Sequence, residues 1–220
     1  MDAATLQQRI YKGYRLAAQR IGYPFTLYRP QSVNNPIIQT NIVGTPLNAS
    51  FTTGQGFNYN KWGKHEDVLW SVLVDGTQTQ VGDYLVSTAR NQTYFIAAQQ
   101  DELPILSVLC SHVLSVSRAA APAVLGTNPY SGATLAGQTP IMTSWPGSLV
   151  MQRHAAYPDA QLPMDVSAPA FVILLPHFSG ADIRTSDIIT DDNNPNRRYT
   201  VAGSELTSLG WRISARIAVA

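Results

Sequence analysis

The sequence predicts a mainly β protein, in which an N-terminal α-helix precedes two related small β-barrel or β-sandwich domains. Three observations predict this fold class. Apolar residues recur at helical spacing over the first 22 residues. After Pro24, short runs of β-branched and aromatic residues alternate with turn-forming residues every ~8–12 positions, as in sandwiches and barrels. The second half of the chain also repeats the pattern of the first half in the same order, which indicates an internal duplication.

The composition is that of a folded chain with few charges. Of the 220 residues, 45% are hydrophobic and only 13% are charged, against ~25% charged in an average soluble domain. Disordered chains combine low hydrophobicity with high net charge, so a wholly disordered chain is excluded. The net charge is +1. Wrapping of nucleic acid by the whole chain is therefore disfavoured, because it requires many Lys and Arg residues to neutralise phosphates.

The predicted N-terminal helix begins after Asp2, a residue type that caps helices. Its apolar face comprises Leu6, Ile10, Tyr14, Ala17 and Ile21. Gly22 follows the last of these residues and Pro24 cannot continue a helix, so we expect the helix to end there.

Four basic residues make this segment positively charged: Arg9, Lys12, Arg15 and Arg20. Two interpretations remain open. The helix packs on its own domain with a solvated charged face, or it is a docking element or a basic surface that faces DNA in an assembly. These four residues are therefore the candidate docking or DNA-facing site.

Candidate strands follow the helix in both halves of the chain. In the first half they span residues 25–28, 37–43, 68–74, 84–87, 93–98 and 106–116. In the second half they span residues 171–175, 187–190, 199–202 and 210–219. Residues 119–138 are rich in Ala, Gly and Pro, which is typical of a linker or a long exposed loop.

Five segments of the first half match segments of the second half. The pairs are 45–51 with 139–145, 72–74 with 173–175, 82–86 with 186–190, 94–97 with 199–202, and 106–116 with 209–219. This period is too long for a solenoid and indicates two tandem copies of one small β domain. The expected organisation is a helix and extended arm over 1–44, a first β domain over 45–118, a linker or long loop over 119–138, and a second β domain over 139–220.

Each copy carries an aspartate at the start of a predicted strand, Asp83 in the first and Asp187 in the second. A carboxylate at such a position caps a turn by accepting backbone N–H bonds. Neither aspartate has a visible partner for acid–base chemistry, so a structural role is expected for both.

The sequence offers little other chemistry. It contains no phosphate-binding glycine loop and no Gly-x-Ser-x-Gly elbow, and its four histidines are scattered without ligand spacing. The one cysteine, Cys110, excludes an intramolecular disulfide and a cysteine-based zinc site, and is expected to be a small buried hydrophobic residue. Pairs such as Tyr28-Arg29 could stack on nucleic-acid bases, but strand cores beside solvated charges are the favoured explanation. We therefore expect no catalytic residue, no cofactor and no metal.

No signal peptide is visible at the N-terminus, and the apolar run over 171–175 is far too short to span a bilayer. Synthesis in a cytoplasm and no membrane partner are the expectations from these features.

Several segments together carry a family resemblance. They are LQQRIYKGYRLAA at 6–18, PFTLYRP at 24–30, GDYLV at 82–86 and TYFIAAQQ at 93–100. Along most of its length the chain resembles structural proteins of tailed bacteriophages and prophages. The shorter module, in which Gly-Asp and a hydrophobic run precede a polar loop and a tyrosine, is similar to the small β-barrels of phage head-completion (stopper) and tail-joining proteins.

This resemblance implies a ring of six- or twelve-fold symmetry around the DNA channel, between the portal and the tail or within a short tail. The implied partners are further copies of the chain, a portal or adaptor protein, tail proteins, and viral DNA that passes without specific contacts. The implied location is the virion, after synthesis in the host bacterial cytoplasm. Two barrels per chain depart from single-barrel stoppers and favour a taller, two-layer neck or a nozzle-like component.

Two other functions remain as alternatives. One is a tail-tip or adhesion-type binding module, which would also use duplicated β domains. The other is an enzyme that holds a sugar or peptide substrate between the two domains. Its candidate carboxylates would be Asp83, Glu102, Asp187 and Glu205.

Overall fold

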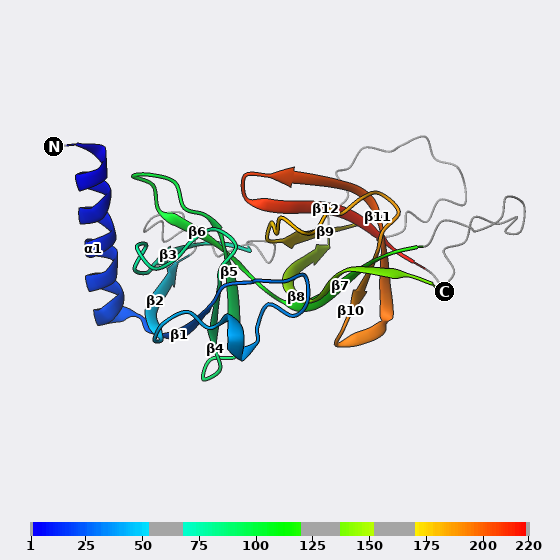
Figure 1. Ribbon diagram of the computed structural model, residues 1–220, viewed down its shortest axis with the longest axis horizontal. Helices are drawn as coiled ribbons and strands as arrows, with labels where there is room; N and C mark the ends of the chain where they lie inside the picture. Colours follow the sequence, from blue (N-terminus) through cyan, green and yellow to red (C-terminus); the bar gives the residue numbers. More distant parts are fainter. Residues whose placement is uncertain (1, 53–67, 120–136, 152–169, 219–220) are drawn as a thin grey trace, which may run out of the picture.

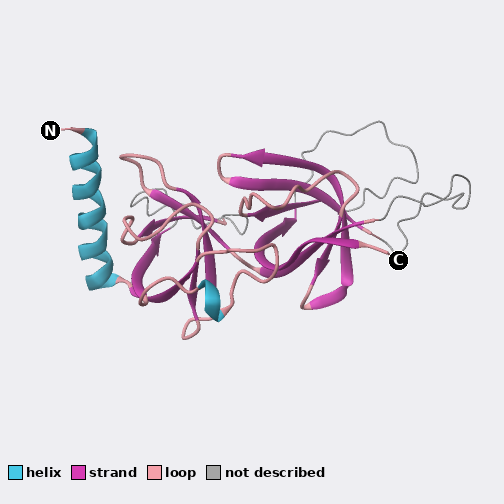
Figure 2. Cartoon of the chain, viewed as in Figure 1, coloured by secondary structure: helices cyan, strands magenta, loops and turns pink. Residues whose placement is uncertain are grey.

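The computed structural model describes residues 2–52, 68–119, 137–151 and 170–218. Figure 1 shows a helix at one end of an elongated molecule, a first β-barrel beside it and a second β-barrel at the other end. Apart from this helix and one short 3₁₀ turn, the described elements are strands (Figure 2). The predicted fold class is therefore confirmed.

Each barrel is a closed sheet of six strands. The first comprises β1 (Tyr23–Tyr28), β2 (Leu47–Thr52), β3 (Leu69–Leu73), β4 (Tyr84–Ser87), β5 (Gln92–Ala98) and β6 (Ile105–Leu109). The second comprises β7 (His112–Arg118), β8 (Thr139–Met151), β9 (Ala170–Leu175), β10 (Ile188–Asp191), β11 (Asn194–Thr207) and β12 (Gly210–Ile217). The helix α1 spans Ala3–Ile21 and the 3₁₀ turn η1 spans Gln39–Asn41.

The strand order shows the duplication directly. The first barrel closes in the order β1-β2-β3-β6-β5-β4, and the second in the equivalent order β7-β8-β9-β12-β11-β10. Even the irregularities repeat, because a bulge in β5 before Ala98 recurs in β11 before Gly203. Bulges bend a strand and increase its twist. Both copies therefore close their barrels with the same device.

The pairing register tests the sequence matches. Val72 opposes Ile105 in the first barrel and Ile173 opposes Ile213 in the second, so the match of 72–74 with 173–175 is correct. The match of 45–51 with 139–145 is wrong, because it is shifted along the strand by an even number of residues. Phe51 opposes Val72, and the residue that opposes Ile173 is Leu149. An even slip keeps every side chain on the same face, so the apolar pattern could not reveal it.

The match of 106–116 with 209–219 is also wrong, because these residues do not form one long strand. In the first copy, β6 ends at Leu109 and β7 begins at His112, so the chain passes from one barrel to the next through Cys110 and Ser111. This junction contains no Gly or Pro, which is why the sequence suggested a single strand.

The domain boundaries move accordingly. The first barrel takes β1 from the expected arm, and the second barrel takes β7 from the expected first domain, so the barrels span 23–109 and 112–217. The candidate strand at 37–43 is also wrong, because it contains η1. There the side chain of Asn41 donates to the carbonyl oxygen of Pro36 and stabilises a turn. Most of the expected linker, residues 120–136, lies outside the described residues.

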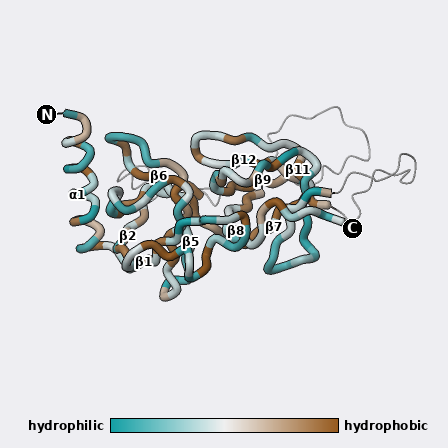
Figure 3. The backbone as a smooth tube through the Cα atoms, in the orientation of Figure 1, coloured by the Kyte–Doolittle hydropathy of each residue, from teal (hydrophilic) through white to brown (hydrophobic). Residues whose placement is uncertain are grey.

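The two barrels pack on each other through a continuous apolar interface. The hydrophobic core of the second barrel extends onto the outer face of β4, β5 and β6, where Tyr84, Phe95 and Val108 are buried. Apolar stretches run along the tube through the contact between the barrels in Figure 3. The Tyr84 hydroxyl donates to the carbonyl oxygen of Pro146 at 2.8 Å, and its ring packs edge-on against Trp145.

The segment that joins β1 to β2 also reaches the second barrel. Trp145 donates its indole N–H to the carbonyl oxygen of Val33 at 2.6 Å, and Asn34 forms a β-bridge with Thr143. This strap and the aromatic contact hold the barrels in one fixed arrangement, because breaking either exposes buried groups.

Candidate functional site

The predicted helix α1 is positioned by two caps. Asp2 accepts a hydrogen bond from the Thr5 amide at 2.8 Å. Hydrogen bonding by the Thr5 side chain and, to a smaller extent, by this amide lowers the pKa of the Asp2 carboxyl. At the other end, the Gly22 amide donates to the carbonyl oxygen of Ala18. A Cβ at Gly22 would lie 2.5 Å from that oxygen and 2.8 Å from the carbonyl oxygen of Ala49. Glycine therefore permits the close turn from α1 into β1.

One face of α1 contacts the first barrel. The Tyr11 ring packs against Gly76, where a Cβ would leave no room, and its hydroxyl accepts a hydrogen bond from Gln99. One helical turn earlier, Gln7 accepts a hydrogen bond from the Glu102 amide. Residues separated by four positions lie on one helix face. This narrow strip holds the helix to the barrel, and Ala18 is the one buried residue described within α1.

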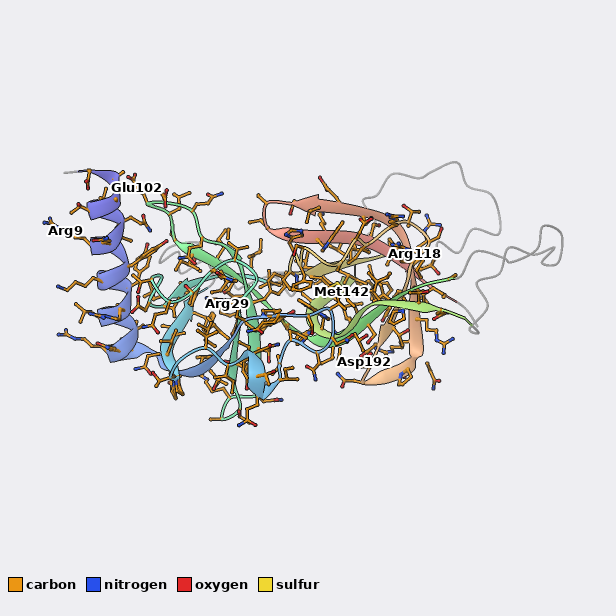
Figure 4. All side chains as sticks on the ribbon, in the orientation of Figure 1. Arg9, Arg29, Glu102, Arg118, Met142 and Asp192 are labelled. Atoms are coloured by element: carbon orange, nitrogen blue, oxygen red, sulfur yellow. The ribbon has the colours of Figure 1, made fainter. Side chains whose placement is uncertain are left out.

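The predicted basic residues lie on this helix and largely face away from the barrel. Arg9, Lys12 and Arg20 are exposed, and Figure 4 shows Arg9 projecting from α1 at the end of the molecule. Arg15 is exposed as well, and one of its guanidinium nitrogens lies 3.9 Å from a carboxylate oxygen of the buried Asp75. The structure therefore places all four candidate residues on the exposed side of α1, with Arg15 near an acidic side chain.

Large apolar side chains are exposed on the same helix. Leu6, Leu16 and Ile21 are 37%, 48% and 61% exposed. Single exposed apolar residues are ordinary, but three on one helix at the end of a molecule form a mixed apolar and basic surface. Such a surface suits contact with another macromolecule.

Asp83 has a partner that sequence reasoning missed. Arg29, directly after β1, donates two hydrogen bonds to its carboxylate, at 2.9 and 2.8 Å. Arg29 also donates to the carbonyl oxygen of Gln78, and Asp83 accepts the amide of Gln80. The bond to Asp83 raises the pKa of the Arg29 guanidinium. The expected turn cap is present, and a bidentate ion pair reinforces it.

The second barrel repeats this arrangement at equivalent positions. Arg118, at the end of β7, donates to both carboxylate oxygens of Asp187 at 2.8 and 2.9 Å. It also donates to the carbonyl oxygen of Asp182, while Asp187 accepts the amide of Arg184. Hydrogen bonding to Asp187 raises the pKa of the Arg118 guanidinium. We call these two ion pairs the arginine–aspartate clasps.

The clasps join distant parts of each barrel. Each connects the end of the first strand of a barrel to the turn before its fourth strand, and both aspartates are buried. A doubly hydrogen-bonded carboxylate that also caps a turn is fixed in place. These aspartates therefore serve the fold, as expected. An arginine just after or at the end of the first strand of each copy was the signal that could have identified their partners.

A Ser-His-Asp group lies at the junction between the barrels. The Ser111 hydroxyl hydrogen bonds to Nδ1 of His112 at 2.8 Å, and Nε2 of His112 lies 3.9 Å from a carboxylate oxygen of Asp191. That second distance is too long for a hydrogen bond. Ser111 also accepts the backbone amide of Leu149, which fastens β8 to the junction. These contacts therefore hold the junction residue Ser111 against the second barrel.

The remaining candidates for chemistry stay separate. His65 and His154 lie outside the described residues. Among the described residues, no three His, Cys, Asp or Glu side chains gather in a way that could hold a metal ion. Cys110 lies in the wall between the barrels, where burial raises the pKa of its thiol well above the usual value. No described helix is both long and apolar enough to cross a membrane.

Comparison with known proteins gives no further guidance. No family model, no curated protein and no solved structure matches this chain. Its function is therefore inferred from the residues and the geometry of the chain itself.

Proposed function

We propose that this chain is a structural protein of a tailed bacteriophage particle, and that copies of it form a ring at the head–tail junction around the DNA channel. The supporting observation is the form of the molecule. Two equivalent barrels are locked into one elongated body, and a helix at one end presents an open basic and apolar face (Figure 1).

The junction between the barrels suits a subunit that bears load. The interface combines a buried tyrosine, a buried tryptophan and the strap from the β1–β2 connection, so the two layers of a ring would keep a fixed spacing. Interfaces packed like protein interiors resist relative motion. A taller, two-layer neck or nozzle-like component agrees with this construction.

The open face of α1 provides the contact to neighbours. Arg9, Lys12, Arg15 and Arg20 are the residues that would meet a portal or adaptor protein or a further copy of the chain, or would face the passing viral DNA. Phosphates attract such side chains without reading sequence. In this role the protein is made in the bacterial cytoplasm and incorporated into the virion, where tail proteins are its other partners.

The alternative functions make different predictions. A tail-tip or adhesion module would lie at the far end of the tail. An enzyme with a site between the barrels would need an open space there, but Tyr84, Phe95 and Trp145 fill the described interface. No observation favours a substrate site at this place.

Electron microscopy of the concentrated protein and of assembled particles tests the proposal. We expect end-on rings with a central channel, and label at the neck of particles that carry a tagged copy. Reversing the charges of Arg9, Lys12 and Arg15 to Glu should reduce assembly or DNA retention. Reversing Arg197, Arg212 and Arg216, exposed residues of the second barrel, is the matched control. Label at the tail tip, or normal particles from the helix variant, would contradict the proposal.

A further inference from the structure

The outer face of α1 carries a compact basic patch with an apolar centre. Leu16 is 48% exposed and lies one helical turn from Lys12 on one side and from Arg20 on the other. Gly13 lies beside them, and a Cβ at that position would meet no atom within 4 Å. We call Lys12, Leu16 and Arg20 the basic patch.

The connection between β5 and β6 carries a complementary feature. Asp101, Glu102 and Leu103 are consecutive and exposed, and Leu103 is 52% exposed. Glu102 adopts a left-handed backbone conformation with φ of 63°, which turns the chain at this point. We call these three residues the acidic tip. The acidic tip presents two carboxylates beside an apolar side chain. The basic patch likewise presents two cations beside an apolar side chain.

Both features lie at the same end of the molecule, but they do not meet within one chain. The acidic tip is tied to the first half of α1 by the hydrogen bond from the Glu102 amide to Gln7. Figure 4 shows Glu102 beside that part of the helix. Leu16 is two and a half turns further along, about 13 Å at the helical rise per residue. The acidic tip of one chain therefore does not reach Leu16 of the same chain, but it is open to the basic patch of a second molecule.

The chemistry of the patch favours a protein surface over nucleic acid. A phosphate backbone would pair with Lys12 and Arg20 but would leave Leu16 without an apolar contact. The acidic tip satisfies both requirements at once, because its carboxylates can pair with Lys12 and Arg20 and its Leu103 can pack against Leu16. Electrostatic complementarity of this kind selects partners and sets their register.

We propose that the basic patch of one copy binds the acidic tip of a second copy, and that this contact joins neighbours in the ring. The ring itself rests on the proposed function. Because patch and tip are different surfaces, the contact is heterologous, and a heterologous contact closes into a ring when its rotation permits. Since both surfaces lie at the α1 end, this end of every subunit would lie on one rim of the ring.

Cysteine cross-linking tests the contact. The variant L16C/L103C should form disulfides between molecules at high protein concentration and give a ladder of multimers on a non-reducing gel. The single variants L16C and L103C should give none of this ladder. Within one chain the two positions are too far apart for a disulfide. The natural Cys110 is present in every variant and should not form these disulfides, because the pKa of its thiol is raised and the thiolate is the reactive form. It therefore serves as an internal control.

Charge exchange provides an independent test. The variants K12E/R20E and D101K/E102K, each combined with the cysteine pair, should reduce cross-linking by about tenfold, because like charges then face each other across the contact. Combining all four charge changes in one chain should restore it. Reduced cross-linking without restoration in the combined variant would overturn the charge pairing.

The outcomes separate this inference from the proposed function. A ladder of multimers from L16C/L103C, with none from the single variants, supports both the contact and the ring. If L16C/L103C forms dimers and no larger multimers, the contact is supported but the ring is not. Rings in electron micrographs without cross-linking overturn the contact and leave the ring in place. Dimers from L16C alone would show that two helices meet each other, which also overturns the contact.

Discussion

The two barrels share their interior but differ on one outer face. Phe95 of the first barrel is 1% exposed, and its equivalent in the second barrel, Thr200, lies open to solvent. Val108 is likewise buried, whereas the equivalent Arg216 is exposed. The same strand positions therefore form an interface in one copy and a polar surface in the other.

This difference shows that residues that specify the barrel are separate from residues that join barrels. The arginine–aspartate clasps, the bulge before the end of the fifth strand and the interior apolar positions are present in both copies. The outer face of β4 to β6 carries Tyr84, Phe95 and Val108, which pack on the second barrel. The equivalent positions on β11 and β12, Thr200 and Arg216, are polar and exposed instead.

Truncating the interface residue should have the largest effect. F95A removes a ring that is buried against the second barrel, and we expect it to lower the free energy of unfolding by about 4 kcal/mol. T200A, at the equivalent exposed position, should change it by less than about 0.5 kcal/mol. Denaturant unfolding followed by tryptophan fluorescence measures both. Equal effects at the two positions would contradict the asymmetry.

Breaking a clasp should have a similar effect in either barrel. R29M and R118M each leave a buried aspartate without its arginine partner, which should lower the free energy of unfolding by about 3 kcal/mol. This value is near the low end of the cost of breaking a buried ion pair, because the guanidinium groups are partly exposed. The two losses should be nearly additive in the double variant, because the clasps belong to different barrels. Unfolding curves of the three variants test this. A large loss from only one of them would show that the copies do not share this device.

The sequence predicted the duplicated β fold because period-two strands and turn residues are local signals. It placed Asp83 and Asp187 in turns for the same reason. It could not pair Arg29 with Asp83, since that contact spans two distant strands and depends on the closed order of the barrel. It also missed the boundary at Cys110, because neither Gly nor Pro marks this short junction between the barrels.

Removing the interface hydroxyl should have a smaller effect. Y84F loses the hydrogen bond to the carbonyl oxygen of Pro146 and should cost about 1 kcal/mol at pH 7. Burial raises the pKa of Tyr84 well above its usual value of about 10. The folded protein therefore holds this proton more tightly than the unfolded chain does. The contribution of the Tyr84 hydroxyl to stability is complete below pH ~10 and is lost as the pH rises above that value.

The pH profile of Y84F tests this link. Its stability should fall less steeply than that of the natural chain between pH ~9 and ~11, although Tyr94 and Tyr199 also have a raised pKa and keep part of the slope. The control is I188V, at the equivalent position of the second barrel, which removes no titrating group. An unchanged slope in Y84F, or a changed slope in I188V, would contradict the assignment.

A similarly small difference is expected from the turn before each clasp aspartate. The two copies hold this position at positive φ, with Gly82 at 90° and Ser186 at 74°. Glycine adopts such a conformation without steric cost, whereas other residues lose roughly 1 kcal/mol. G82S should therefore destabilise the first barrel by about 1 kcal/mol, and S186G should stabilise the second by up to the same amount. A Cβ at Gly82 would meet only the carbonyl oxygen of His177, at an ordinary 3.5 Å, so the effect isolates backbone strain. Thermal unfolding of both variants measures it, and a change of the same sign in both would show that the turns are not equivalent.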